Sequence, residues 1–126
     1  MKTRQGFVSN SSSSSFILDL RKPLVKGWLD DIKKLPKAEG TGRYTCKAIG
    51  KDAVRYAKEW IEEAGEYYAE SQDGLGHWIL KWAEKLGENN IVFLRESDED
   101  MGGNFRDCGL DYKEISNAAE SEMEYH

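Results

Sequence analysis

A chain of 126 residues with 39% hydrophobic residues, four Trp, six Tyr and four Phe can bury a core, which excludes a disordered protein. Its net charge of −5, from 23 acidic and 18 basic residues, disfavours a protein whose task is to neutralise nucleic-acid phosphates. No apolar run reaches the roughly 18 residues of a membrane span, and the N-terminus lacks the apolar segment of a secretory signal, so we expect a cytoplasmic protein without membrane association.

The first predicted elements are a strand, a helix and a second strand. Residues 16–20 are largely apolar and read as a strand that directly follows a run of serines. The next apolar side chains fall on one helical stripe, which predicts a helix over 23–35 with Pro23 in its first turn and Pro36 after its end. β-branched and aromatic residues predict a strand over 43–49.

The second half of the chain is predicted to contain three helices and one strand. Amphipathic stripes predict helices over 51–70 and 75–86, the second closed by Gly87 in a left-handed conformation. The continuous apolar run 91–94 is typical of a strand covered on both faces, so we expect it to be central. A weak stripe predicts a last helix over 110–123 whose final residues fray.

This order of elements predicts a single α/β or α+β domain over 1–126, with a sheet of three to four strands layered with three to four helices. Parallel strands would gather Arg21-Lys22, Gly50-Lys51-Asp52 and residues 96–100 at one edge of the sheet. An antiparallel sheet would scatter them.

An acidic, glycine-rich loop follows the predicted central strand. Asp98 and Asp100 are its candidate metal ligands, because carboxylate oxygens bind hard cations. A calcium-binding loop starting at Asp98 would place Gly102 and Gly109 where two ligands belong, so a solvated charged loop is the favoured interpretation. The acidic candidates for an interaction surface are Glu96, Asp98, Glu99 and Asp100.

The four tryptophans all lie on predicted apolar stripes, which favours core packing. If exposed, a large aromatic side chain concentrates binding energy at a protein interface. Trp60, with the neighbouring Tyr67, is our aromatic candidate for such an interface.

No complete catalytic constellation or cofactor motif is present, so we name no catalytic residue and expect no cofactor. Gly50-Lys51-Asp52 lacks the other residues of a phosphate-binding loop. Cys46 and Cys108 are expected to be free thiols, and no neighbouring residue activates Cys46 for a nucleophilic pair with His77. The Glu-x-Glu pattern in 120–124 is loosely similar to ADP-ribosyltransferases, but the chain is too short for their two-sheet nicotinamide site.

The N-terminus carries the most specific pattern of the chain. Residues 6–16, Gly-Phe-Val-Ser-Asn-(Ser)5-Phe, resemble the opening of many small uncharacterised proteins of bacteria and tailed phages. The resemblance covers about the first 16 residues and implies an origin without implying a chemistry. Residues 1–15 are a candidate Ser-rich arm, and the run 9–15 is either a mobile linker or a hydrogen-bonded bend between 7–8 and 16–17.

These observations favour a small acidic, phage-related accessory protein that binds a host or phage protein, of the host-takeover or defence-inhibitor type. One alternative is a virion or assembly component with an ordered N-terminal arm. Another is a small metal- or phosphate-ligand-binding domain or enzyme that uses Lys51 and the acidic loop at 96–100. The sequence leaves the oligomeric state open.

Overall fold

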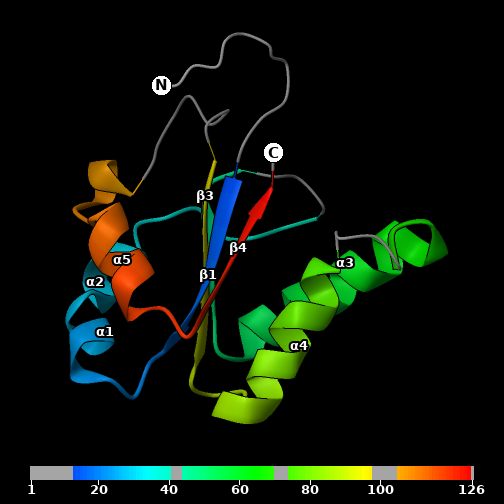
Figure 1. Ribbon diagram of the computed structural model, residues 1–126, viewed down its shortest axis with the longest axis horizontal. Coiled ribbons are helices and arrows are strands. Elements are labelled where there is room, and N and C mark those ends of the chain that lie inside the picture. The colour runs from blue at the N-terminus through cyan, green and yellow to red at the C-terminus, as the bar shows by residue number, and fades with distance from the viewer. Residues whose placement is uncertain (1–12, 41–43, 70–73, 98–104, 126) are drawn as a thin grey trace, which may run out of the picture.

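Four antiparallel strands form a single sheet in the order β2-β3-β1-β4 (Figure 1). The computed structural model describes residues 13–40, 44–69, 74–97 and 105–125. The strands are β1 (Ser13–Asp19), β2 (Cys46–Ile49), β3 (Ile91–Ser97) and β4 (Ser121–Tyr125).

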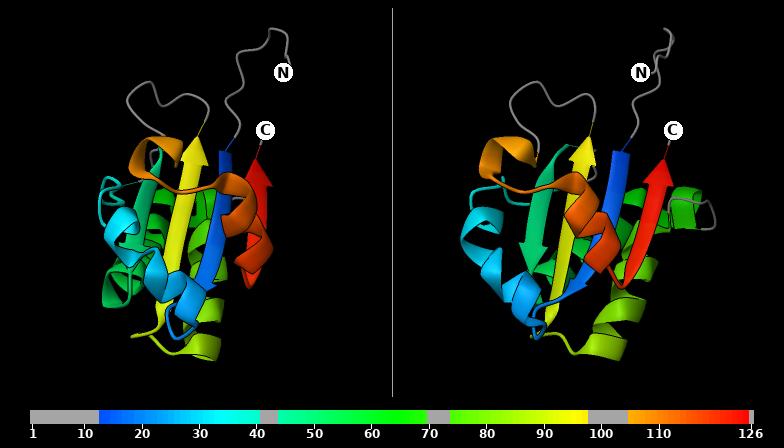
Figure 2. Two further views of the ribbon diagram at one scale, coloured as in Figure 1. Left: turned by 90° about the vertical axis from the view of Figure 1, so that its left-hand side faces the viewer. Right: turned by 60° about the vertical axis from the view of Figure 1, so that its left-hand side comes forward.

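Helices cover both faces of the sheet, so the protein has three layers (Figure 2). The two long helices, α3 (Lys51–Ala69) and α4 (Leu75–Leu86), lie side by side on one face. The other face is covered by α1 (Pro23–Gly27), α2 (Leu29–Ile32), the 3-10 helix η2 (Arg106–Cys108) and α5 (Tyr112–Ala118). The predicted small α+β fold with a layered sheet is confirmed.

Each face of the sheet supports its own hydrophobic core, because side chains alternate between faces along a strand. Ile17 and Phe93 pack under α3 and α4. Phe16, Leu18 and Leu94 pack under the short helices. The continuous apolar runs of β1 and β3 follow from this double coverage, and the predicted central position of the 91–94 strand is confirmed.

The predicted helix over 75–86 has the expected bounds. It ends at Gly87, whose φ of 99° is easy only for glycine and whose N–H donates to the Ala83 carbonyl at 2.8 Å. The ψ of 136° lies outside the left-handed helical region that we expected there.

The predicted helix over 23–35 is wrong in its continuity, because the chain forms two short helices that meet at Trp28. The φ and ψ of Trp28, −92° and −4°, depart from α-helical values. No side chain caps either helix at its N-terminus, and Gly27 is a poor helix former. The apolar stripe predicts the burial of Val25 and Ile32 correctly, but Leu24, which also belongs to it, is 58% exposed.

The predicted helix over 110–123 is also wrong beyond its first half. Asp111 caps α5 by accepting a hydrogen bond from the Glu114 N–H at 3.0 Å, and the helix gives way at Ala119 to extended backbone. Residues 121–125 then form β4, with Met123 packed against the core. Pairing with β1 therefore outweighs the weak helical stripe.

The serine run enters the sheet, so the predicted arm of residues 1–15 is too long. Ser13–Ser15 form the first half of β1, while Ser9–Ser12 and residues 7–8 lie outside the described residues. β1 has β3 on one side and β4 on the other, and Phe16 stands opposite both Leu94 and Glu122. β3 and β4 thus occupy both sides of β1 at residues 16–17, and the choice between a linker and a bend before Ser13 concerns residues outside the described ones.

Candidate functional site

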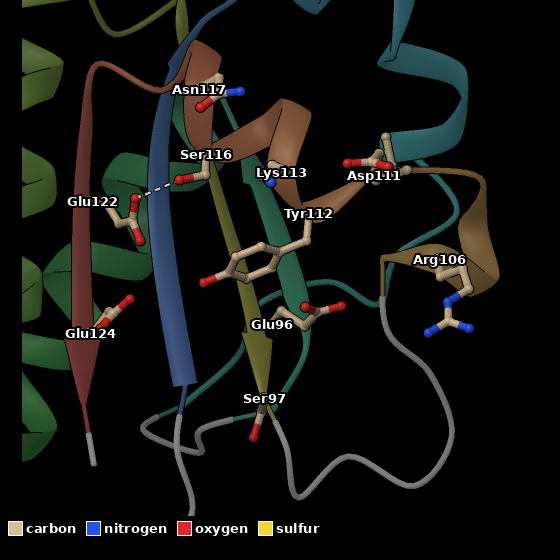
Figure 3. Close-up of a pocket in the computed structure, with 11 residues that line it drawn as sticks. Glu96, Ser97, Arg106, Asp111, Tyr112, Lys113, Ser116, Asn117, Glu122 and Glu124 are labelled. Atoms are coloured by element: carbon tan, nitrogen blue, oxygen red, sulfur yellow. Dashed lines mark hydrogen bonds between the residues drawn. The ribbon is translucent and has the colours of Figure 1, made fainter. Parts of the chain in front are cut away.

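A pocket of about 850 Å³ opens between α5 and the end of the sheet at which β3 and β4 finish (Figure 3). Its walls come from β3, β4, α5 and the 3-10 helix η2. The charged residues that line it are the carboxylates Glu96, Asp111, Glu122 and Glu124 and the cations Arg106 and Lys113.

Strand register places three of these carboxylates on one face of the sheet. Ser14 on β1 stands directly opposite Glu96 on β3 and Glu124 on β4, so the three residues form a row across the sheet. Glu122 lies two residues before Glu124 and therefore points to the same face. Since neighbouring strands lie about 4.8 Å apart, the backbones at Glu96 and Glu124 are about 10 Å apart. Within the described ranges, no group of three or more His, Cys, Asp or Glu could hold a metal ion.

Tyr112 from α5 lies over this row (Figure 3). Its phenol donates a hydrogen bond to the Ser14 hydroxyl at 2.9 Å. Its ring meets the Phe16 ring edge-on, with centroids 5.4 Å apart, and remains 39% exposed. The ring is thus anchored by the core below while one part of it faces the pocket.

Burial raises the pKa of the Tyr112 phenol above 10.0, and the nearby carboxylates Glu122, Glu124 and Glu96 raise it further, against the opposing effect of the Ser14 hydrogen bond. A phenolate would be repelled by these negative charges. The neutral phenol is therefore the form that the site stabilises.

We expect this pKa shift to appear as a loss of stability at alkaline pH. Above about pH 10 the unfolded phenol loses its proton before the folded one does, so the free energy of unfolding falls as pH rises through that range. Tyr112→Phe should remove this pH-dependent component and cost up to about 1 kcal/mol at neutral pH through the lost hydrogen bond. Urea unfolding of the wild type and of Tyr112→Phe between about pH 8 and about pH 11 measures this component. If the two free energies of unfolding differ by the same amount at every pH, the raised pKa of Tyr112 is contradicted.

Hydrogen bonds hold two of the carboxylates in place. The Phe105 N–H donates to Glu96 Oε2 at 2.7 Å, which ties the chain before η2 to β3. The Ser116 hydroxyl donates to Glu122 Oε1 at 2.8 Å, which ties α5 to β4. Such fixed carboxylates suit an ammonium or guanidinium group, because hydrogen bonds between ionised partners are the strong ones.

Of the predicted interaction residues, the structure places only Glu96 at this site among the residues that it describes. Glu96 lines the pocket, whereas Asp98, Glu99 and Asp100 lie outside the described residues. Trp60 is buried, 5% exposed, and packs beside Tyr56 in the core, so our interface interpretation of Trp60 is wrong and the core-packing alternative holds. The side chain of Tyr67 lies outside the described part of the structure.

The other sequence candidates lie at the opposite end of the sheet from Glu96. Because the sheet is antiparallel, β1 and β2 end where β3 begins, which places Arg21-Lys22 and Gly50-Lys51-Asp52 away from the pocket. Asp52 accepts a hydrogen bond from Arg55 Nε at 2.8 Å within the first turn of α3. This is an ordinary helix start, as the sequence indicated.

Both cysteines are free thiols, as predicted. Cys46 is buried in β2, while His77 is exposed on α4. Burial raises the pKa of the Cys108 thiol, which lowers the fraction of reactive thiolate.

Sequence reasoning missed most of the pocket, because two of its carboxylates belong to the unpredicted β4. The alternation Ser121-Glu122-Met123-Glu124-Tyr125 was the available signal, since a period of two residues is typical of a strand. Asp111 followed by Glu114 was the available signal for the start of α5.

No protein-family model matches the chain, and neither the curated proteins nor the solved structures compared with it give a match. In the portion of the chain that the structure describes, no helix is both long and apolar enough to cross a membrane.

Proposed function

We propose that this protein is a small acidic accessory protein that acts by binding another protein, and that its carboxylate-lined pocket receives a basic side chain of that partner. The observation that carries the proposal is the convergence of Glu96, Glu122 and Glu124 around the half-exposed Tyr112. These groups come from β3, β4 and α5 and form one surface only in the folded chain.

The chemistry of the pocket favours a lysine or arginine over an apolar or acidic group. A charged hydrogen bond to a carboxylate contributes about 1.5–3 kcal/mol, and the exposed face of an aromatic ring attracts a cation. Glu96 and Glu122 already have fixed positions, so little ordering is needed on binding. The net charge of −5 also accelerates encounters with basic partners.

The biological setting that we propose is phage-related, with a host or phage protein as the partner. The resemblance of the first 16 residues to small proteins of bacteria and tailed phages supports this setting. Carboxylates on strands whose backbones lie about 10 Å apart can also occupy positions where a target protein expects phosphates. A host-takeover factor or a defence inhibitor would act in this way.

A pull-down from host lysate with matched charge variants tests the proposal. The double variant Glu122→Lys/Glu124→Lys reverses the charge of the pocket. Glu84→Lys/Glu88→Lys makes the same charge change at exposed positions on and just after α4. We expect wild type and the second variant to retain one stoichiometric partner, and the pocket variant to lose it or bind it at least tenfold more weakly. Absence of a stoichiometric partner, or equal retention by both variants, would contradict the proposal.

A further inference from the structure

The two edges of the sheet differ in how they are covered. The outer side of β2 is occupied by the segment before it, because the Lys47 N–H donates to the Pro36 carbonyl at 2.8 Å and the Ala38 N–H donates to the Lys47 carbonyl at 2.9 Å. At the other edge, β4 has β1 as its only strand neighbour among the described residues. Figure 2 shows β4 as the outermost strand on that side.

The structure also shows that β4 is held firmly from within the protein. Met123 packs into the core under α4, and the Trp78 indole N–H donates to the Ser121 hydroxyl at 3.1 Å. On the opposite face, Glu122 is bonded to Ser116 of α5. An edge strand fixed on both faces is ordered before any partner arrives, which favours the addition of another strand.

The charges on β4 specify what can lie beside it. An added strand would place its side chains about 5 Å from those of β4, and like charges at that distance destabilise the pair. A second copy of this chain, paired antiparallel about Met123, would bring Glu122 of each copy opposite Glu124 of the other. A strand with basic residues at positions i and i+2 would instead pair with both carboxylates on one face.

We propose that the outer edge of β4 docks an extended segment of a partner protein that carries lysine or arginine at alternate positions, adding a fifth strand to the sheet. This inference rests on the proposed function and specifies the form of the partner. The backbone ladder gives affinity, and Glu122 and Glu124 give register and selectivity. Because both carboxylates also line the pocket, the added strand would lie beside it and continue the same acidic surface.

Synthetic peptides with the full-length protein test this inference. The first peptide alternates lysine with threonine and valine, the second has the same composition with its lysines clustered, and the third is the alternating peptide N-methylated on alternate backbone amides. We expect the alternating peptide to bind at least tenfold more tightly than the other two and to slow amide hydrogen exchange in 121–125. In the Glu122→Lys/Glu124→Lys variant, an alternating aspartate peptide should replace the lysine peptide as the preferred ligand.

Three results would overturn the inference. Equal binding of the three peptides without slower exchange in β4 would show a charged surface that needs no added strand, and the proposed function would stand without the docking edge. Slow amide exchange across the whole of 121–125 in the protein alone would show that the outer edge of β4 is already covered. If the slowing depends on protein concentration, a second copy of the chain covers the edge. If it does not, another part of the same chain covers it. Failure of the alternating peptide to bind would reject the docking edge, while the pull-down would still decide the proposed function.

Discussion

Arg95→Ala is expected to destabilise the protein by about 3–5 kcal/mol, a large part of the total stability of a domain of this size. Arg95 lies on β3 with 1% of its surface exposed, and it is among the largest fully buried side chains of the described residues. Its guanidinium lies 5.6 Å from the centroid of the Phe93 ring and 5.9 Å from that of Trp60, and its Nε donates to the Ser15 hydroxyl at 3.4 Å. Alanine would leave both a cavity and buried polar groups that lose their donor.

One further variant separates the contributions of volume and charge at position 95, and another is a control at the surface. Arg95→Met fills most of the same space without the charge, so it should cost less than alanine. Arg106→Ala removes an exposed arginine and should change the free energy of unfolding by no more than about 0.5 kcal/mol. Urea denaturation followed by tryptophan fluorescence measures all three. A loss below about 1 kcal/mol for Arg95→Ala would show that this arginine does not support the sheet.

Gly76→Ala is expected to cost about 2–3 kcal/mol by forcing α3 and α4 apart. A Cβ atom at position 76 would lie 2.6 Å from the Ala57 carbonyl oxygen and 2.6 Å from Ile61 Cγ1. The Ile61 side chain can rotate, but the Ala57 oxygen belongs to the backbone of α3 and moves only with the helix. The higher helix propensity of alanine, about 1 kcal/mol, offsets only part of this strain.

Gly27→Ala provides the matched control, because it makes the same chemical change at the exposed end of α1. Nothing lies within 4 Å of a Cβ atom built at position 27. We therefore expect this substitution to be neutral or to stabilise the protein by up to about 1 kcal/mol. Thermal unfolding of the two variants gives the comparison, and equal effects at positions 76 and 27 would refute the close approach of the two helices.

The sequence predicts those elements whose pattern is complete within the element itself. The helix over 75–86 has a full apolar stripe, and the strand containing 91–94 has an apolar run too short for a helix, so both are recognised locally. Among the side chains of β4 that the structure describes, only Met123 packs against the core, and the strand owes its conformation to pairing with β1 near the other end of the sequence. A local pattern cannot contain that information.

The candidate site shares this limitation. Glu96 follows the predicted strand 91–94, and as a predicted interaction residue it was the part of the pocket that the sequence could indicate. Glu122 and Glu124 join it only because the register of β1 brings β3 and β4 to one face of the sheet. Tyr112 could be identified as a site residue only once α5 had been placed over Ser14.

The central position of β1 has a consequence during protein synthesis. Ser15 stands opposite Arg95, 80 residues further along the chain, and opposite Met123, which is made later still. Of the four described strands, β1 is thus the first to leave the ribosome. It has neither neighbour until β3 and β4 have been synthesised, which favours late and slow closure of the sheet. During that interval the apolar run 16–18 is open to pairing with other chains, and polar residues beside such a run oppose aggregation. We expect the serines before it to act as gatekeepers that keep the nascent strand from aggregating until its partners have been translated.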